Sequence, residues 1–390
     1  MSEWKEYKLG GLCTDINYGY TASANNVGGG PKFLRITDIV PQRVDWAAVP
    51  YCEIDVKNSS KYKLEKGDIV IARTGATTGY NYTFNDDVDA VFASYLIRYR
   101  INNSLASPFY IGYLLKSDNW KGFVDNIIGG SAQPGANAKM FADFDILLPP
   151  KPIQEKVVET LSALDEKIDL LHRQNKTLEE LAETFFRQWF VEEAEDDWEE
   201  ESLYDSVDLI GGGTPKTSVS EYWNGAIGWL SAGDIANSHK GFVVNSEKYI
   251  TELGLKNSSA RLLPKYSTVI TARGTVGKYC MLSKPMAYSQ SNYGILPKHE
   301  GCFYFTYLLV AHSVERLLAA AYGTVFDTIT TNTFKEQMMP LPPATRIKKF
   351  ELEVTPLFNK IFTNTKQIRT LTQLRDTLLP KLMSGEVKIN

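Results

Sequence analysis

The sequence has 390 residues, of which 43% are hydrophobic and 23% charged, and its formal net charge is −4 at pH 7. This length allows two or more domains with their own cores, and the composition excludes a disordered chain. No apolar run reaches the roughly 18 residues of a membrane span, the polar N-terminus lacks a signal-peptide core, and no CxxC pair occurs. We therefore expect a cytoplasmic protein without a disulfide framework.

Residues 1–150 are predicted to form a globular unit that is mostly β, with a few short helices. The segments DIVIART at 68–74 and LIRYRI at 96–101 are rich in β-branched residues and Tyr, which favour strands. Turns that contain Gly separate these segments.

A long helix is predicted at about 152–190, directly after the proline-rich segment ILLPPKPIQEKV at 146–157. Proline fixes φ and lacks an N–H group, so it suits the approach to a helix and its first turn. The 39 residues from 152 to 190, at about 1.5 Å each, would give a rod of roughly 58 Å. The apolar spacing is that of a two-helix seam. Its positions are Leu161, Leu164, Ile168, Leu171, Asn175, Leu178, Ala182 and Phe185.

The segment EEAEDDWEEE at 192–201 contains 8 of the 46 acidic residues and no basic residue. Without this segment, the chain has 42 basic and 38 acidic residues. We interpret the segment as a solvated acidic connector. The total charge of the chain is therefore a poor guide to what its other surfaces bind.

Residues 192–343 repeat the first unit at a nearly constant offset. WKEYKL at 4–9 matches WEEESL at 198–203, and FLRITDI at 33–39 matches WLSAGDI at 229–235. KGDIVIARTGATTGY at 66–80 resembles PKYSTVITARGTVGKY at 264–279. We therefore predict a second β-rich unit with the same fold.

A second long helix is predicted at about 345–385, after the proline junction PLPPATRIKKF at 340–350. Pro356 lies inside this run, where a proline costs about 3 kcal/mol, and Pro380 lies near its end. We therefore expect this helix to be bent or to begin late, with a further bend near Pro380. Its seam positions are Val354, Leu357, Ile361, Asn364, Ile368, Leu371, Arg375 and Leu378.

The simplest partner for each helix is the other one, in an antiparallel pair that would place the β-rich units at opposite ends. Each seam contains one asparagine, Asn175 or Asn364, and we place the two at different levels. A seam asparagine either fixes register and partner or only tolerates a wet layer, and the sequence leaves both open. The predicted fold class is α+β, a pseudo-two-fold internal repeat. It consists of two β-rich units (1–150 and 192–343) joined by two long antiparallel coiled-coil helices (151–191 and 344–390).

The chemical motifs in the sequence predict no catalytic or metal site. GGGTPKT at 211–217 lacks the ending of a phosphate-binding loop, and the 4 histidines form no metal-ligand set. LDEKI at 164–168 superficially resembles part of a nuclease motif, but it lies on the helix, where its charged residues are expected to be exposed. The Asp/Asn-Pro-Pro-Tyr tetrapeptide of adenine amino-methyltransferases does not occur.

Loops rich in hydrogen-bond donors occur at equivalent positions of both copies, such as 72–82 and 271–279. Arg pairs with guanine, Gln and Asn with adenine, and Ser and Thr hold phosphates. Such loops are also common as hairpin turns, and Arg73 and Arg273 could instead brace their own loops. The candidate DNA-binding residues are Arg35, Thr37, Arg73, Thr74, Thr77, Ser231, Arg273, Thr275, Lys278, Gln290 and Asn292.

Four segments together resemble the specificity (S) subunit of type I restriction-modification enzymes, over essentially the whole chain. They are LLPPKPIQEK at 147–156, LAETFFRQWF at 181–190, LLPKLMSGEVKI at 378–389 and the TARGTVGK loop at 271–278. One departure is Ile347, which stands where the second copy would repeat Gln154. The resemblance implies that the β-rich units are target recognition domains that read the two halves of an asymmetric DNA site. The helices would set the spacing between these halves.

The resemblance also implies partners. Two methyltransferase (M) subunits would carry S-adenosylmethionine and methylate adenine N6, and motor-nuclease (R) subunits would join for cleavage. This chain would bind no cofactor and run no reaction. The competing classes are an adaptor that spaces two protein ligands and an enzyme with an unfamiliar site. Exposed helix faces and an aromatic cluster are candidate M-subunit contacts, with packing inside the chain as the alternative for the cluster. The cluster consists of Phe185, Phe186, Trp189 and Phe190.

Overall fold

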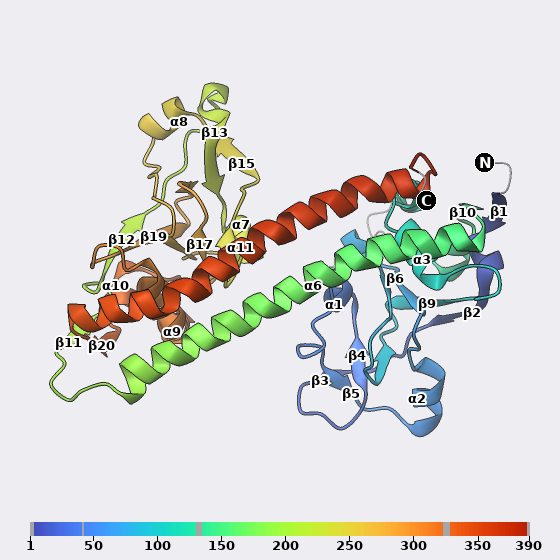
Figure 1. The fold of residues 1–390 in the computed structure, drawn as a ribbon, viewed down its shortest axis with the longest axis horizontal. Coiled ribbons are helices and arrows are strands. Elements are labelled where there is room, and N and C mark those ends of the chain that lie inside the picture. Colours follow the sequence, from blue (N-terminus) through green and yellow to red (C-terminus); the bar gives the residue numbers. More distant parts are fainter. Residues whose placement is uncertain (1–3, 41–42, 130–134, 323–327, 388–390) are drawn as a thin grey trace. The chain divides into compact units, whose positions relative to one another are not determined.

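The computed structural model describes residues 4–40, 43–129, 135–322 and 328–387. The chain folds as two compact units, and Figure 1 labels their elements. Unit 1 comprises residues 1–169 and 371–390, and unit 2 comprises residues 170–370. Each unit therefore contains a globular part, the start of the long helix that follows it, and the end of the other long helix. Lys388 and Ile389 of the C-terminal motif lie outside the described residues.

Unit 1 contains two four-stranded sheets, ordered β2-β9-β6-β7 and β3-β5-β4-β8, and a separate antiparallel pair of β1 and β10. Its core includes the fully buried Tyr99, Tyr110 and Phe141. Its strands are β1 Lys5–Lys8, β2 Cys13–Tyr18, β3 Ala24–Asn25, β4 Lys32–Leu34, β5 Tyr51–Cys52, β6 Ile69–Ala72, β7 Asn81–Thr83, β8 Ala90–Phe92, β9 Leu96–Ile101 and β10 Asp145–Leu148. Its short helices are η1 Leu9–Leu12, α1 Ile36–Ile39, α2 Val56–Tyr62, η2 Gly75–Thr77, α3 Pro108–Leu114, α4 Asp118–Ile128 and α5 Ala138–Ala142.

Unit 2 contains a five-stranded sheet, β12-β19-β16-β17-β14, a three-stranded sheet, β15-β13-β18, and the antiparallel pair of β11 and β20. Its strands are β11 Glu200–Ser202, β12 Val207–Gly211, β13 Trp223–Leu230, β14 Phe242–Val243, β15 Lys248–Ile250, β16 Thr268–Thr271, β17 Tyr279–Leu282, β18 Ala287–Tyr288, β19 Asn292–Pro297 and β20 Met338–Pro340. Its shorter helices are η4 Ser220–Tyr222, α7 Ala232–Asn237, α8 Glu252–Lys256, α9 Phe303–Tyr322 and α10 Thr331–Lys335.

The two units repeat one plan, which confirms the predicted duplication. The strand order β12-β19-β16-β17 corresponds to β2-β9-β6-β7, and the parallel pair of β13 and β18 corresponds to β4 and β8. A short helix follows β4 in unit 1 and β13 in unit 2. One difference is that the single helix α9 stands where unit 1 has α3 and α4.

The two long helices are also confirmed. Helix α6 spans Lys151–Arg187 and continues into one π-helical turn, η3 at Gln188–Glu192, and α11 spans Ala344–Met383. The first turn of α6 forms behind the prolines, where the Ile153 N–H donates to the Pro150 carbonyl over 2.9 Å. None of the helices in the described ranges is long and apolar enough to cross a membrane.

The long helices pair in antiparallel fashion within each unit. In unit 2, the Asn364 amide donates to Asn175 Oδ1 over 2.9 Å, and Arg346 donates to the Trp189 carbonyl over 3.0 Å. Residue numbers therefore fall along α11 as they rise along α6. In unit 1, the Arg375 guanidinium donates to Asp165 over 2.9 Å. Most predicted seam positions are buried or half-buried, as a two-helix seam requires.

The seam asparagines meet each other, so the prediction that they lie at different levels is wrong. The antiparallel arrangement brings Asn175 opposite Asn364, whose side chain is fully buried. Asn175 Nδ2 also approaches Thr365 Oγ1, at 3.5 Å. The Asn364 donor meets the Asn175 acceptor in one register only, which favours the role of fixing register.

Replacing Asn364 by alanine is expected to lower the free energy of unfolding of unit 2 by about 1–2 kcal/mol, because the Asn175 amide loses its partner. The double replacement Asn175→Leu and Asn364→Leu should recover most of this loss, because both polar groups then leave the seam. Urea titration of Asn364→Ala and of the double variant, beside the wild type, checks this. A double variant that is no more stable than Asn364→Ala would contradict the pairing.

Pro356 does not delay the start of α11, so the late start that was one of the two expected alternatives is wrong. The helix begins at Ala344 and runs without interruption through Pro356 and Pro380. Pro356 is exposed, whereas Val354 and Phe358 beside it are buried, at 0% and 2% exposure. Burial of this inner face offsets the cost of one missing backbone hydrogen bond, about 3 kcal/mol.

Ile347 stands where the second copy would repeat Gln154, and the role of Gln154 is taken in unit 2 by a residue one helical turn later. In unit 1, Gln154 Oε1 accepts the N–H of Ser107, just before α3, over 2.8 Å. Ile347 is fully buried in the core of unit 2 and cannot do this. Glu351 instead accepts the N–H groups of Tyr304 and Phe305 at the start of α9, over 3.0 and 2.8 Å. Both units therefore use the long helix to satisfy the start of the helix packed against it.

Candidate nucleic-acid interface

The donor-rich loops of unit 1 meet at one end of the sheet β2-β9-β6-β7. At this end β2 and β6 finish, at Tyr18 and Ala72, while β9 and β7 begin, at Leu96 and Asn81. Neighbouring strands lie about 4.8 Å apart, so the residues at their ends form a row across the sheet. This row, which we call row 1, consists in order of Tyr18, Tyr95, Arg73 and Tyr80.

Arg73 braces row 1 from within, which is the alternative considered for it. Its Nε donates to the Ser94 carbonyl over 3.2 Å, and its guanidinium lies 5.2 Å from the centre of the Tyr18 ring. Its backbone N–H donates to the Tyr95 carbonyl over 3.0 Å. The half-buried Arg73 therefore holds the β8–β9 turn and one wall of the row.

The other candidates of unit 1 lie on the segments around this row. Thr74 precedes the short helix η2 in the loop after β6, Thr77 is its last residue, and both are half-buried. Thr37 is exposed in α1. Arg35, at the start of α1, is held by Asp38 through hydrogen bonds of 3.0 and 2.9 Å. These bonds raise the pKa of Arg35 further above neutrality and leave its guanidinium partly engaged.

Unit 2 has an equivalent row, row 2, at the same end of its sheet. Along β12, β19, β16 and β17, row 2 consists in order of Gly211, Ser291, Ala272 and Lys278. The candidates Arg273, Thr275 and Gln290 are exposed on the loops that adjoin the row. Within the described part of the chain, no ion pair or hydrogen bond holds the Arg273 side chain. Arg273 is therefore an exposed, free cation, whereas Arg73 is half-buried and held by Ser94 and Tyr18.

Arg73 and Arg273 do not occupy equivalent positions in the two units. The alignment of the two loops that paired them in the sequence is therefore wrong at this point. Arg73 donates its N–H to Tyr95 and accepts from the Ala136 N–H, and Ala272 makes the same two bonds with Ser291 and Ile329. Ala272 is therefore the counterpart of Arg73.

A difference in loop length explains the error. Gly79 donates to Ala72, and Gly277 donates to Thr271, so the two glycines close equivalent loops. Both have positive φ, +89° and +79°, which favours glycine. The first loop is one residue longer, so the sequence match of ART with ARG shifts by one position.

Two candidates in unit 2 have structural roles. Asn292 is 1% exposed, and its amide donates to Ser289 Oγ over 2.9 Å, so it lies inside the turn and away from the surface. Ser231 caps α7: its Oγ accepts the Asp234 N–H over 3.2 Å, and Asp234 accepts the Ser231 N–H over 2.8 Å. Both residues shape the loops near row 2.

Charges of both signs surround Lys278. A cavity of about 480 Å³ beside it is also lined by Glu183, Arg187 and Lys240. Lys240 and Glu183 form an ion pair of 3.3 Å. Burial, and then the charge of Lys278, lowers the pKa of His239 in the same wall, so this histidine is neutral at pH 7. The free cations near row 2 are therefore lysines and arginines.

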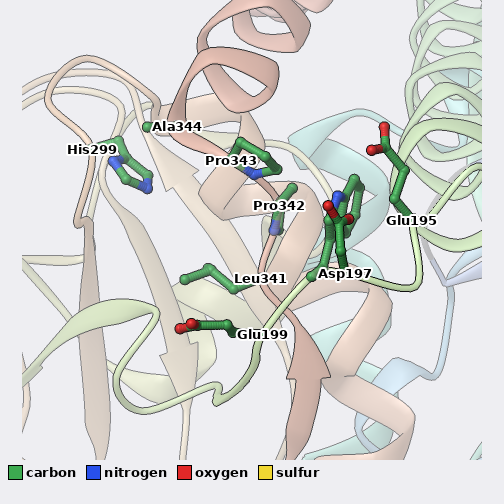
Figure 2. Close-up of a pocket in the computed structure, with 9 residues that line it drawn as sticks. Glu195, Asp197, Glu199, His299, Leu341, Pro342, Pro343 and Ala344 are labelled. Atoms are coloured by element: carbon green, nitrogen blue, oxygen red, sulfur yellow. The ribbon is translucent and has the colours of Figure 1, made fainter.

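A second pocket, of about 330 Å³, lies at the second proline junction (Figure 2). Its wall includes three carboxylates, Glu195, Asp197 and Glu199, from the acidic connector, together with His299 and Pro342. This concentration of negative charge repels phosphates, so the pocket does not suit nucleic acid or a nucleotide. Among the described residues, no cluster of three or more His, Cys, Asp or Glu could hold a metal ion.

The duplicated rows and paired helices agree with a known family. The family model described as type I restriction modification DNA specificity domain matches residues 1–180 and again residues 195–373. The chain belongs to this family. The HindI type I restriction enzyme specificity subunit of Haemophilus influenzae is 24% identical over 471 residues, covering 99% of this chain and 100% of that protein. The MjaIX specificity subunit of Methanocaldococcus jannaschii is 26% identical over 305 residues, 72% of this chain and 69% of that protein.

A solved structure shares the specificity-domain fold. The crystal structure of a type I restriction-modification S subunit from M. genitalium matches with a TM-score of 0.59, 15% sequence identity and coverage of 97% of this chain and 96% of that one. This likeness supports the architecture of two repeated domains with long helices.

In this member of the specificity-domain family, the aromatic cluster belongs to the core of unit 2. Phe186 and Phe190 are 3% and 7% exposed, and their rings pack against Phe305 and Phe350. The half-buried Trp189 lies under the guanidinium of Arg346, and Phe185 is also half-buried. Packing inside the chain, the alternative considered for this cluster, accounts for its aromatic character.

The sequence analysis missed the three tyrosines of row 1. Tyr18, Tyr80 and Tyr95 are 43%, 40% and 58% exposed, which is high for large side chains. They come from segments far apart in the sequence, and only the strand pairing brings them together. The signals available were that Tyr95 directly precedes LIRYRI, already predicted as a strand, and that Tyr80 lies in the donor-rich loop at 72–82.

Proposed function

We propose that this chain is the sequence-specific DNA-recognition subunit of a type I restriction-modification complex in the cytoplasm. Unit 1 reads one half of a bipartite, asymmetric site, and unit 2 reads the other half. The chain docks two methyltransferase subunits, which carry S-adenosylmethionine and methylate adenine N6, and motor-nuclease subunits join for cleavage. The chain itself binds no cofactor and runs no reaction.

The observation that carries this proposal is the pair of rows. The two rows lie at the corresponding ends of equivalent sheets in units 1 and 2. Donor-bearing loops surround both rows, and their side chains differ at every position. A shared frame with different contact residues is what two different half-sites require. The family assignment and the full-length HindI relative favour this function over an adaptor that spaces two protein ligands.

Mapping methylated adenines across the genome, with and without this protein, tests the proposal. Loss of the protein should remove methylation at one bipartite motif. Arg273→Ala should lower methylation about tenfold at sites that carry the preferred bases of the second half, because an exposed arginine that pairs with a base is removed. Lys298→Ala, at the opposite end of the same sheet and paired with Asp208 at 2.7 Å, is the matched control and should change nothing. A methylation pattern that is independent of this protein would overturn the proposed function.

A further inference from the structure

We propose that Tyr95 is a specificity-determining residue that contacts the bases of the first half-site through its ring, so that the two half-sites are bound by different physical means. Unit 1 contacts its half through uncharged aromatic side chains, whereas unit 2 uses the cations Arg273 and Lys278. This inference rests on the proposed function, and it assigns to that function a residue that the sequence did not indicate.

The position of Tyr95 is rigid, although its side chain is exposed. Tyr95 lies at the tip of the turn between β8 and β9, where the Leu96 N–H donates to the Ala93 carbonyl over 2.8 Å. The preceding residue, Ser94, is held on both sides: its N–H donates to Tyr20 over 2.9 Å, and its carbonyl accepts from Arg73 Nε over 3.2 Å. A large side chain, 58% exposed on a turn fixed in this way, is preorganised to contact a ligand.

The neighbours of Tyr95 extend the contact surface. Tyr18 stands next to it in row 1 and Tyr80 lies beyond Arg73 on the other side, at 43% and 40% exposure. The Tyr18 hydroxyl accepts the Ala138 N–H over 3.0 Å, so its ring is fixed. An exposed row of three tyrosines leaves apolar surface in water, which a soluble protein keeps where the surface meets a partner. Duplex DNA is the partner that fits, because the donor-bearing loops of unit 1 adjoin the same row.

Unit 2 replaces each tyrosine by a different chemistry at the same place in the fold. Ser291 is the counterpart of Tyr95, because its carbonyl accepts the Ala272 N–H over 2.9 Å, as that of Tyr95 accepts from Arg73. Lys278 stands in the place of Tyr80, and Gly211 in the place of Tyr18. Row 2 therefore has a cation, Lys278, in the place of one aromatic ring and the small residues Gly211 and Ser291 in the places of the other two.

This difference predicts how each half-site responds to salt. A lysine or arginine that neutralises a phosphate displaces counterions, so its contribution to binding weakens as salt rises. A tyrosine ring that contacts a base edge or a thymine methyl group displaces none. Substitution of a row 1 tyrosine should therefore change affinity without changing the salt dependence, whereas loss of the row 2 cation Lys278 should change both.

Binding assays on the full chain assembled with its methyltransferase subunits test this inference. The probes are the duplex that carries the methylated motif and the same duplex with the first or the second half scrambled. Tyr95→Ala should weaken binding to the intact duplex about tenfold and leave binding to the first-half-scrambled duplex unchanged. The affinity of Tyr95→Phe for the intact duplex should stay within about twofold of the wild-type affinity, because the ring makes the contact. Lys278→Ala should reduce the slope of log affinity against log salt by about one, while Tyr95→Ala keeps the wild-type slope.

Two matched controls separate a direct contact from a change in folding. Leu105, 39% exposed beyond the opposite end of β9, is the control for apolar exposure in unit 1, and Leu105→Ala should bind like the wild type. Lys298→Ala, at the opposite end of the row 2 sheet and paired with Asp208, is the control for Lys278→Ala and should keep the wild-type affinity and salt slope. Unchanged binding by Tyr95→Ala, or equal weakening on intact and scrambled duplexes, would overturn the specificity role of Tyr95. A wild-type complex that binds all duplexes alike would overturn the proposed function, and this inference with it.

Discussion

Replacing Phe190 by alanine is expected to lower the free energy of unfolding of unit 2 by about 3–5 kcal/mol, as for other buried phenylalanines. The Phe190 ring is 7% exposed and lies 5.1, 5.1 and 4.8 Å, centre to centre, from the rings of Phe186, Phe305 and Phe350. Its loss would leave a cavity where the end of α6, the start of α11 and α9 meet. Chemical unfolding of the isolated chain measures the effect.

The control for Phe190 is its neighbour Val191, which is 47% exposed in the same π-helical turn. Val191→Ala should change stability by no more than about 0.5 kcal/mol. If Phe190 served mainly to dock a partner, Phe190→Ala would leave the isolated chain as stable as the wild type and weaken only assembly. That result would contradict the assignment of the cluster to the core.

Glu351→Gln is expected to remove a pH dependence of stability. Burial raises the pKa of Glu351 to about 7, against the opposing effect of the backbone N–H groups that it accepts. Because this pKa is higher in the folded chain than in the unfolded chain, the folded state holds the proton more tightly. The carboxyl therefore contributes stability at low pH, and that contribution is lost as the pH rises from about 4.5 to 7.

The measurement is the difference in unfolding free energy between the wild type and Glu351→Gln at pH 5 and at pH 8. Relative to the variant, the wild type should lose about 2–3 kcal/mol over this interval. Gln has one acceptor oxygen and bonds one backbone N–H less well, which shifts the unfolding free energy of the variant equally at both pH values and does not affect the comparison. Glu353→Gln, at an exposed position of the same helix, is the control. Its unfolding free energy should change between pH 5 and pH 8 as that of the wild type does. A constant difference between pH 5 and pH 8 would show that Glu351 titrates normally.

The features that could be predicted from the sequence are those that repeat locally. The offset of 193 between the proline junctions, the heptad seam and the strand-like runs such as LIRYRI are all short-range patterns, and each corresponds to an element of the fold. The late helix start suggested by Pro356 is wrong, because helix propensity is a weak term beside the burial of Val354 and Phe358 on the inner face.

The features that could not be predicted depend on contacts between distant segments. Row 1 draws Tyr18, Tyr80 and Tyr95 from three strand ends, so its existence follows from strand order and not from any local motif. Arg73 and Arg273 look equivalent in the sequence, but a one-residue difference in loop length separates them in the fold. Asn175 and Asn364 meet because helix direction, which no single helix encodes, sets which layers face each other.

The division of the long helices between the units has a consequence for synthesis. Unit 2 is one continuous stretch of chain, residues 170–370, whereas unit 1 needs residues 371–383 of α11, which pack through Leu378, Leu379 and Leu382 into its core. Although most of unit 1 is synthesised first, its core is complete only after residues 371–383 leave the ribosome. Unit 2 can therefore finish folding while unit 1 still lacks part of its core. A nascent chain that stops before Leu371 would expose the apolar face of unit 1 to chaperones and proteases.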